Sequence, residues 1–295
     1  MLKPHIYIPI EIIPRELDSK ILFSLFAAKS GYRIYIGTKK SINHILKKKQ
    51  KLGNKSGIFF YKSQFISEYK NMSKLIQNVC DKFVILDEEL GPVVKNVKQI
   101  LNERLKNIKN IDQFYVIGNE MKYLVMSNKK ELSKKIFITG WPRIDLWSKK
   151  FSKIYDRKVK SIKKEFGEYI IFSSDFGAIS KSGLSDIIRH FKKKKRYQPI
   201  VKTFQKSFKD YLEFRSFIKS ASKISKKKII IRPHPADRYH STWYEDFKGE
   251  KNIYIIYDDD ISPWLLGSSA MIHRGCTTAI QSYFYGKPIY YWQSR

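Results

Sequence analysis

The feature that most constrains the fold is a regular alternation of short apolar runs with helical stretches along the chain. The runs are rich in β-branched and aromatic residues, and the stretches between them repeat apolar residues at helical spacing, as Leu17, Ile21 and Leu25 do before Gly31. This alternation predicts parallel β-sheets covered by helices on both faces. The predicted strands are residues 5–10, 32–36, 57–61, 83–86, 113–117, 136–139, 168–173, 229–232, 253–257, 270–273 and 288–292.

The chain of 295 residues is long enough for two domains. The alternation weakens after Trp141 in a lysine-rich segment and resumes at residue 168. We therefore predict an α/β protein with a Rossmann-like domain over residues 1–150, a linker over 151–165 and a second Rossmann-like domain over 166–295. We expect the two domains to face a cleft. The chain stops soon after the last predicted strand, so we expect the second domain to be truncated in this sequence.

The balance of charge is strongly basic, with 58 Lys and Arg against 27 Asp and Glu, a formal net charge of +31. One interpretation is that lysine is simply frequent on a solvated surface. The other is a basic face that attracts anionic lipid, sugar phosphate or nucleic acid. The sequence carries no zinc-ligand spacing, aromatic RNA-binding signature or basic heptads, so we predict no specific nucleic-acid partner.

The N-terminal apolar run is interrupted by Pro9, Glu11 and Pro14, which is not the pattern of a signal peptide. The two cysteines indicate no disulfide framework, and no stretch approaches the ~20 apolar residues of a membrane span. These features predict a cytoplasmic protein, with attachment to the inner face of the membrane left open. The acids at residues 258–260 lack the spacing of metal ligands, and no glycine-rich dinucleotide or Walker loop is present, so we predict neither metal nor cofactor.

A rigid turn follows the strand at residues 229–232. In Arg232-Pro233-His234-Pro235 each proline forces the residue before it into an extended conformation. Arg232 then presents a fork that suits a phosphate, and His234 presents a hydrogen-bond donor. Because ligands bind at the carboxyl ends of parallel strands, these residues predict a nucleotide-phosphate site. The competing interpretation is a surface turn with an incidental histidine.

Two further strand ends could complete that donor site. The strand at residues 270–273 ends at His273 and runs through Gly275 into a predicted helix beginning near Thr277 and Thr278. The first backbone N–H groups of a helix lack intrahelical partners and attract anions, although threonine capping alone would explain the pattern. The strand at residues 168–173 ends in a loop with small polar residues that could approach the phosphate. They are Ser173, Ser174 and Gly177.

The first domain contributes carboxylates at its own strand ends. Asp87, Glu88 and Glu89 follow the strand at residues 83–86, and one of them could act as a general base on an acceptor hydroxyl. The alternative is an acidic helix start favoured by the helix dipole. The other polar residues at strand exits of this domain are candidates for acceptor binding. They are Glu11, Arg15, Arg143 and Asp145.

Several of these segments resemble bacterial surface-carbohydrate biosynthesis proteins, which are glycosyltransferases of the GT-B type that build capsule and lipopolysaccharide. The similarity lies in residues 6–11, 15–17 and 139–145, and in the Arg-Pro-His-Pro and Thr-Thr-Ala-Ile segments. A histidine-proline motif paired with an acidic motif is more distantly similar to sialyltransferases and Kdo transferases, which use CMP-sugars. The resemblance covers most of the chain but little of the connecting regions.

The resemblance implies inverting, metal-independent sugar transfer from a nucleotide-sugar, with a CMP-sugar as one option, to a glycan or lipid-linked acceptor. It implies that His234, Thr277 and Thr278 contact the nucleotide phosphate and that one acid at residues 87–89 is the base. Leu90 separates these acids from the following glycine, which departs from the family's acidic motif. Three alternatives stay open: a CDP-glycerol-type glycerophosphotransferase, a sugar-nucleotide epimerase, and a non-enzymatic basic protein that binds polyanions.

Overall fold

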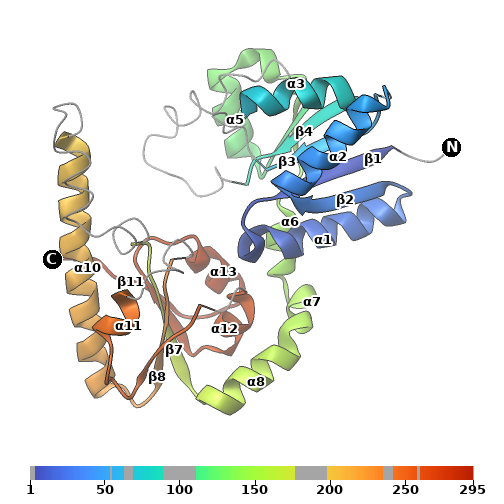
Figure 1. Cartoon of the computed structure of the whole chain (residues 1–295). Coiled ribbons are helices and arrows are strands. Elements are labelled where there is room, and N and C mark those ends of the chain that lie inside the picture. Colours follow the sequence, from blue (N-terminus) through green and yellow to red (C-terminus); the bar gives the residue numbers. More distant parts are fainter. Residues whose placement is uncertain are drawn as a thin grey trace. The chain divides into compact units, whose positions relative to one another are not determined.

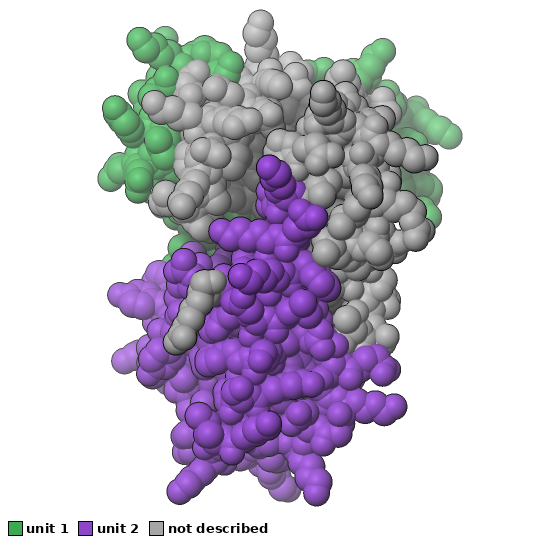
Figure 2. Space-filling view, turned by 90° about the vertical axis from the view of Figure 1, so that its left-hand side faces the viewer, with its two compact units in different colours: residues 1–146 green, residues 147–295 purple. Residues whose placement is uncertain are grey.

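The computed structural model describes residues 4–53, 55–62, 69–88, 111–176, 198–234, 242–257 and 260–294. The chain divides into two compact units, Met1–Leu146 (unit 1) and Trp147–Arg295 (unit 2). Figure 2 colours these units separately, and Figure 1 labels their helices and strands.

Unit 1 contains a wholly parallel sheet with strand order β2-β1-β3-β4-β5-β6 among its described residues. Helices cover both of its faces (Figure 1). The strands are β1 His5–Ile10, β2 Arg33–Thr38, β3 Ile58–Tyr61, β4 Lys82–Leu86, β5 Gln113–Val116 and β6 Ile136–Ile138. The described helices are α1 Ile13–Lys29, α2 Lys39–Lys51, α3 Tyr69–Val79, α5 Asn119–Asn128, the short η2 Lys130–Leu132 and α6 Pro142–Leu146.

The two cores of unit 1 follow from the alternation of side chains along each strand. In β1, Tyr7 packs with Leu46 of α2 and Ile76 of α3. Its neighbours Ile6 and Ile8 point to the opposite face and pack with residues of α1 and α6. Because both faces of the sheet are covered, β1 is nearly continuously apolar, as the sequence indicated.

Unit 2 contains a second wholly parallel sheet, with order β11-β10-β7-β8-β9 among its described residues. Its strands are β7 Tyr169–Ser173, β8 Lys228–Arg232, β9 Ile253–Ile255, β10 Ala270–His273 and β11 Ile289–Tyr291. Its described helices are α7 Lys149–Ser152, the short η3 Lys153–Tyr155, α8 Asp156–Phe166, α10 Gln198–Ile224, α11 Thr242–Asp246, α12 Ser262–Gly267 and α13 Thr278–Phe284.

Helices also cover both faces of the unit 2 sheet (Figure 1). Ile230 packs with Phe166 of α8 and Trp264 of α12. Its neighbour Ile231 faces the other core, with Phe214 of the long helix α10 and Trp243 of α11. The sheet is therefore sandwiched in the same way as that of unit 1.

The prediction of two parallel-sheet α/β domains is confirmed. Each predicted strand is present, and its ends differ from the predicted ends by two residues at most. The residues predicted to link the domains form most of α8, whose Ile162 and Phe166 are buried in the unit 2 core because they lie one helical turn apart on one face. No described helix is both long and apolar enough to cross a membrane.

Candidate functional site

Four strand-terminal residues form a row across the carboxyl edge of the unit 2 sheet. Ser173 at the end of β7 lies in register with Arg232 of β8 on one side and His273 of β10 on the other. His273 is in turn in register with Tyr291 of β11. Neighbours in register on parallel strands lie about 4.8 Å apart and point to the same face of the sheet. We call Arg232, Ser173, His273 and Tyr291 the terminal row.

The contacts of Arg232 and Ser173 place these two side chains on the face covered by α12 and α13. The Arg232 guanidinium lies 6.0 Å from the centre of the Trp264 ring in α12. The Cys276 thiol, just before α13, donates to Ser173 Oγ at 3.2 Å. Arg232 and Ser173 are only 7% and 5% exposed, so the row begins in a buried, partly apolar setting. A buried arginine beside hydroxyl and imidazole groups suits an anionic ligand.

The exit of β8 is hydrogen bonded to the exit of β7. The His234 N–H donates to Ser174 Oγ at 3.2 Å, and the Ser174 N–H donates to the Arg232 carbonyl at 3.3 Å. The structure therefore brings together four of the predicted donor-site residues, Arg232, His234, Ser173 and Ser174. Gly177 lies outside the described residues.

The exit of β10 brings His273 and Gly275 to the same edge. The Gly275 N–H donates to His273 Nδ1 at 3.1 Å, in a turn where Gly275 has a φ of 75°. Thr277 and Thr278 follow, and α13 begins at Thr278. Thr277 is exposed and its side chain makes no capping hydrogen bond to the helix. The threonine-capping interpretation therefore does not account for this hydroxyl.

Arg274, which was not among the predicted site residues, ties three segments of unit 2 together. Its Nη1 donates to both carboxylate oxygens of Asp175, at 3.0 and 2.9 Å, and its Nη2 donates to Asp210 of α10 at 2.5 Å. Burial opposes ionisation of Asp210, but hydrogen bonds from Ser294 and Arg274 outweigh it and lower the pKa of this carboxyl. The guanidinium also lies 4.8 Å from the centre of the Phe176 ring. Arg274 thus ties the exits of β7 and β10 to α10.

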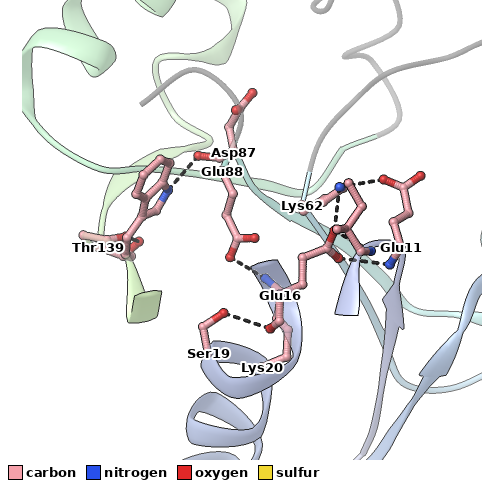
Figure 3. A network of polar contacts seen from close by, with 11 residues as sticks. Glu11, Glu16, Ser19, Lys20, Lys62, Asp87, Glu88 and Thr139 are labelled. Atoms are coloured by element: carbon pink, nitrogen blue, oxygen red, sulfur yellow. Dashed lines mark hydrogen bonds and ion pairs between the residues drawn. The ribbon is translucent and has the colours of Figure 1, made fainter. Parts of the chain in front are cut away.

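The carboxyl edge of unit 1 carries a network of ion pairs (Figure 3). Lys62, directly after β3, lies 2.6 Å from Glu11 after β1 and 2.7 Å from Glu16 of α1. Lys20 of α1 lies 2.6 Å from Glu88 after β4. Because parallel strands end at one edge, charges that are far apart in the sequence meet here.

Glu16 organises the turn between β1 and α1. Its carboxylate accepts hydrogen bonds from the backbone N–H groups of Glu11 and Ile12, each at 3.1 Å, in addition to the Lys62 ammonium. Glu16 is 3% exposed and Lys20, one turn later, is 1% exposed. A weak sequence signal existed for this pair, since Glu16 and Lys20 are four positions apart on a predicted helix that directly follows a strand. An acid and a lysine at this spacing more often face solvent, so their burial was not predicted.

The predicted residues of unit 1 divide between the buried network and the surface. Asp87 and Glu88 are 3% and 7% exposed, and the Asp87 carbonyl accepts a hydrogen bond from Trp141 Nε1 at 2.9 Å. Glu89 lies outside the described residues. The Glu11 side chain keeps 29% exposure. The other predicted acceptor residues lie on α1 and α6, two helices that contact each other. They are Arg15, Arg143 and Asp145.

The described residues contain no group of three or more side chains arranged to hold a metal ion. The acids at positions 258 and 259 lie outside the described residues, and Asp260 accepts a hydrogen bond from the backbone N–H of Ser262 at 2.8 Å. The assignments of individual site residues stay predictions.

No protein-family model and no curated protein sequence matches the chain. Solved structures do match it. A structure of the wall teichoic acid polymerase TagF solved with CDPG is 10% identical, with a TM-score of 0.52 over 98% of this chain and 69% of that one. The UDP-GlcNAc 2-epimerase of Methanocaldococcus jannaschii is 13% identical, with a TM-score of 0.54 over 97% and 82%. A candidate UDP-N-acetylglucosamine 2-epimerase of Listeria monocytogenes is 11% identical, with a TM-score of 0.57 over 99% and 80%. At such identities the likeness shows the fold alone, which is that of the GT-B type.

Proposed function

We propose that the chain is a glycosyltransferase of cell-surface polysaccharide biosynthesis that transfers a sugar from a nucleotide-sugar to a glycan or lipid-linked acceptor. Unit 2 binds the donor and unit 1 binds the acceptor. The observation that carries the proposal is the terminal row, in which a buried arginine stands in register with serine and histidine at the carboxyl ends of parallel strands. This edge is where open α/β sheets bind ligands.

The donor site works by stabilising the phosphate of the leaving nucleotide. Arg232 supplies a permanent positive charge, and Ser173, Ser174 and His234 supply hydrogen-bond donors from two adjoining strand exits. Thr277 and Thr278 add hydroxyl groups at the start of α13. Groups fixed in advance around developing negative charge lower the barrier to departure without a metal ion.

The acceptor site contributes the base. A carboxylate removes the proton of the acceptor hydroxyl while its oxygen forms the new glycosidic bond, and the nucleotide leaves with the electron pair of the broken bond. The candidates are Asp87, Glu88 and Glu89, of which Glu88 is held by Lys20. Glu11, Arg15, Arg143 and Asp145 are the proposed acceptor-binding residues. The net charge of +31 favours binding to an anionic membrane surface, where lipid-linked acceptors would be found.

A second candidate is a CDP-glycerol-type glycerophosphotransferase. It is favoured by the likeness in fold to the polymerase TagF in the structure solved with CDPG. This enzyme would transfer phosphate to the acceptor together with glycerol, whereas a glycosyltransferase leaves all phosphate on the nucleotide. The fold is equally that of the two epimerases, which would act on a nucleotide-sugar without an acceptor.

The test is calorimetric titration of CMP, CDP, UDP and GDP into the wild type, His234→Ala and a matched control, His44→Ala, whose histidine is exposed on α2 of unit 1. We expect selective binding of one nucleotide family, weakened about tenfold in His234→Ala and unchanged in the control, because a hydrogen bond to a charged group is lost. Selective CMP binding supports a CMP-sugar donor.

Binding of none of these nucleotides would contradict the donor site. Equal, strongly salt-sensitive binding of all four nucleotides by all three proteins would favour the non-enzymatic alternative. Once the nucleotide is known, the fate of its phosphate separates the two transferases, since only the glycerophosphotransferase carries labelled β-phosphate of its donor into the product.

A further inference from the structure

The two ring nitrogens of His273 have different surroundings. Nδ1 lies 3.1 Å from the backbone nitrogen of Gly275. Nε2 makes no hydrogen bond with any residue in the part of the chain that the structure describes. The ring therefore has one committed nitrogen and one that is available to a ligand.

The Gly275 contact determines which nitrogen carries the proton. A backbone N–H can only donate, so Nδ1 must keep its lone pair, and the neutral ring then carries its hydrogen on Nε2. The turn holds this geometry because Gly275 adopts a φ of 75°, which other residues rarely adopt. The backbone of His273 is held as well, since its carbonyl accepts the Trp292 N–H at 2.8 Å.

The groups packed around the ring favour the uncharged form. The ring of Tyr291 lies 5.6 Å away, centre to centre, on one side, and Ser173 is its neighbour in register on the other. Asp175 is the acid whose charge acts on the ring, and both of its oxygens accept hydrogen bonds from Arg274. Burial lowers the pKa of His273, and Asp175 offsets this only in part.

We propose that His273 is a neutral imidazole that donates a hydrogen bond from Nε2–H to a phosphate oxygen of the bound nucleotide. It acts beside Arg232 in the terminal row. The Arg232 guanidinium supplies a fixed positive charge to the phosphate, and the Nε2–H group of His273 supplies an uncharged hydrogen-bond donor. The identity of the ligand, a nucleotide phosphate, rests on the proposed function. The assignment of the proton to Nε2 does not. A consequence is that donation from His273 persists at pH values above the ordinary histidine range.

The first test needs no ligand. Long-range ¹H–¹⁵N NMR spectra of protein labelled at its six histidines distinguish the two neutral tautomers and the charged ring. The His273 signals are assigned by their loss in His273→Gln. We expect the Nε2–H tautomer at pH 7.5. A ring protonated on Nδ1, or charged at that pH, would overturn the inference.

The second test measures binding of CMP, CDP, UDP and GDP to the wild type, His273→Gln, His273→Ala and the control His44→Ala. The glutamine amide can place an N–H near the position of Nε2, so we expect His273→Gln to bind within about threefold of the wild type and His273→Ala about tenfold more weakly. Equal binding by His273→Ala and wild type would overturn the role in binding.

Two outcomes separate this inference from the proposed function. If the wild type binds none of CMP, CDP, UDP and GDP, the proposed function and the ligand contact both fail, while the ligand-free spectrum still decides the tautomer. If His234→Ala loses binding but His273→Ala does not, the proposed function stands and the role of His273 is wrong. Melting temperatures of the variants show whether His273→Ala remains folded. If it does not, the His273 ¹⁵N signals of the wild type carry the test: we expect them to shift on addition of the bound nucleotide, and unchanged signals would overturn the role in binding.

Discussion

The two units place different chemistry on the same kind of sheet edge. In unit 1 the carboxyl ends of β1, β3 and β4 carry Glu11, Lys62 and Glu88, and each of these charges contacts an opposite charge of the chain itself. In unit 2 the terminal row contains an arginine but no carboxylate. The nearby acids Asp175 and Asp210 are both bound by Arg274.

This difference shows that one topology can carry two different arrangements of charge at the same edge of its sheet. The charges of the unit 1 network compensate one another, which suits the neutral, hydroxylated acceptor that we propose for this edge. The terminal row offers donors and one cation, and it therefore favours an anion. The buried ion pairs of unit 1 are also sensitive to the loss of one partner, because the remaining charge is then buried without a counter-charge.

The largest expected effect comes from breaking the Lys20–Glu88 pair. Glu88→Gln leaves a lysine that is 1% exposed without its counter-charge, and we expect it to lower the free energy of unfolding of unit 1 by about 3–5 kcal/mol. The double variant Lys20→Met with Glu88→Leu should recover most of the loss. Hydrogen exchange of the β1 and β4 amides measures unit 1 alone.

Lys82→Met is the matched control for that prediction. Lys82 lies 3.4 Å from Asp112, and its side chain is 59% exposed, so its removal should change stability by less than about 1 kcal/mol. Equal effects of Glu88→Gln and Lys82→Met would show that the buried network contributes no more than a surface pair.

An intermediate effect is expected when Arg274 is removed from unit 2. The pKa of Asp210 is lowered in the folded protein, so this carboxylate stabilises unit 2 above the ordinary aspartate pKa of about 4 and loses that contribution as the pH falls through its lowered value. We expect Arg274→Ala to cost about 2 kcal/mol at pH 7 and clearly less at pH 3. Urea unfolding at both pH values measures this, and a cost independent of pH would contradict it.

The smallest effect concerns the turn beside His273. Gly275 has a φ of 75°, and a Cβ there would meet only Asp175 Oδ2, at 3.8 Å. The cost of Gly275→Ala is therefore backbone strain of about 1 kcal/mol. Gly118 is the control, because its φ of −170° is extended and nothing lies within 4 Å. Urea unfolding should show a loss for Gly275→Ala of at least twice that for Gly118→Ala, and equal losses would contradict a strained turn.

Much of the carboxyl edge of the unit 2 sheet was predictable because it depends on local signals. Prolines at positions 233 and 235 mark a strand exit, and His273 and Gly275 mark another, so the sequence indicated which side chains lie at strand ends. The order of strands was not predictable in this way. Only the pairing of β7 between β8 and β10 places Ser173 between Arg232 and His273.

The residues that the sequence analysis missed are those whose partners are distant in the chain. Lys62 meets Glu16 across 46 positions, and Arg274 meets Asp175 across 99. Tyr291 joins the terminal row only through the pairing of β11 with β10. Nothing near these residues in the sequence shows that a charge will be buried or a ring will border the site.

The sequence by itself determined the class of fold, since periodic apolar runs and helical spacing act over a few residues and require two covered parallel sheets. It also determined which polar residues follow strands. The tertiary structure alone decided which of those residues are neighbours and which charges compensate one another, because both depend on strand order and burial. The difference between the ion-paired carboxyl edge of unit 1 and the terminal row of unit 2 was therefore decided by the tertiary structure.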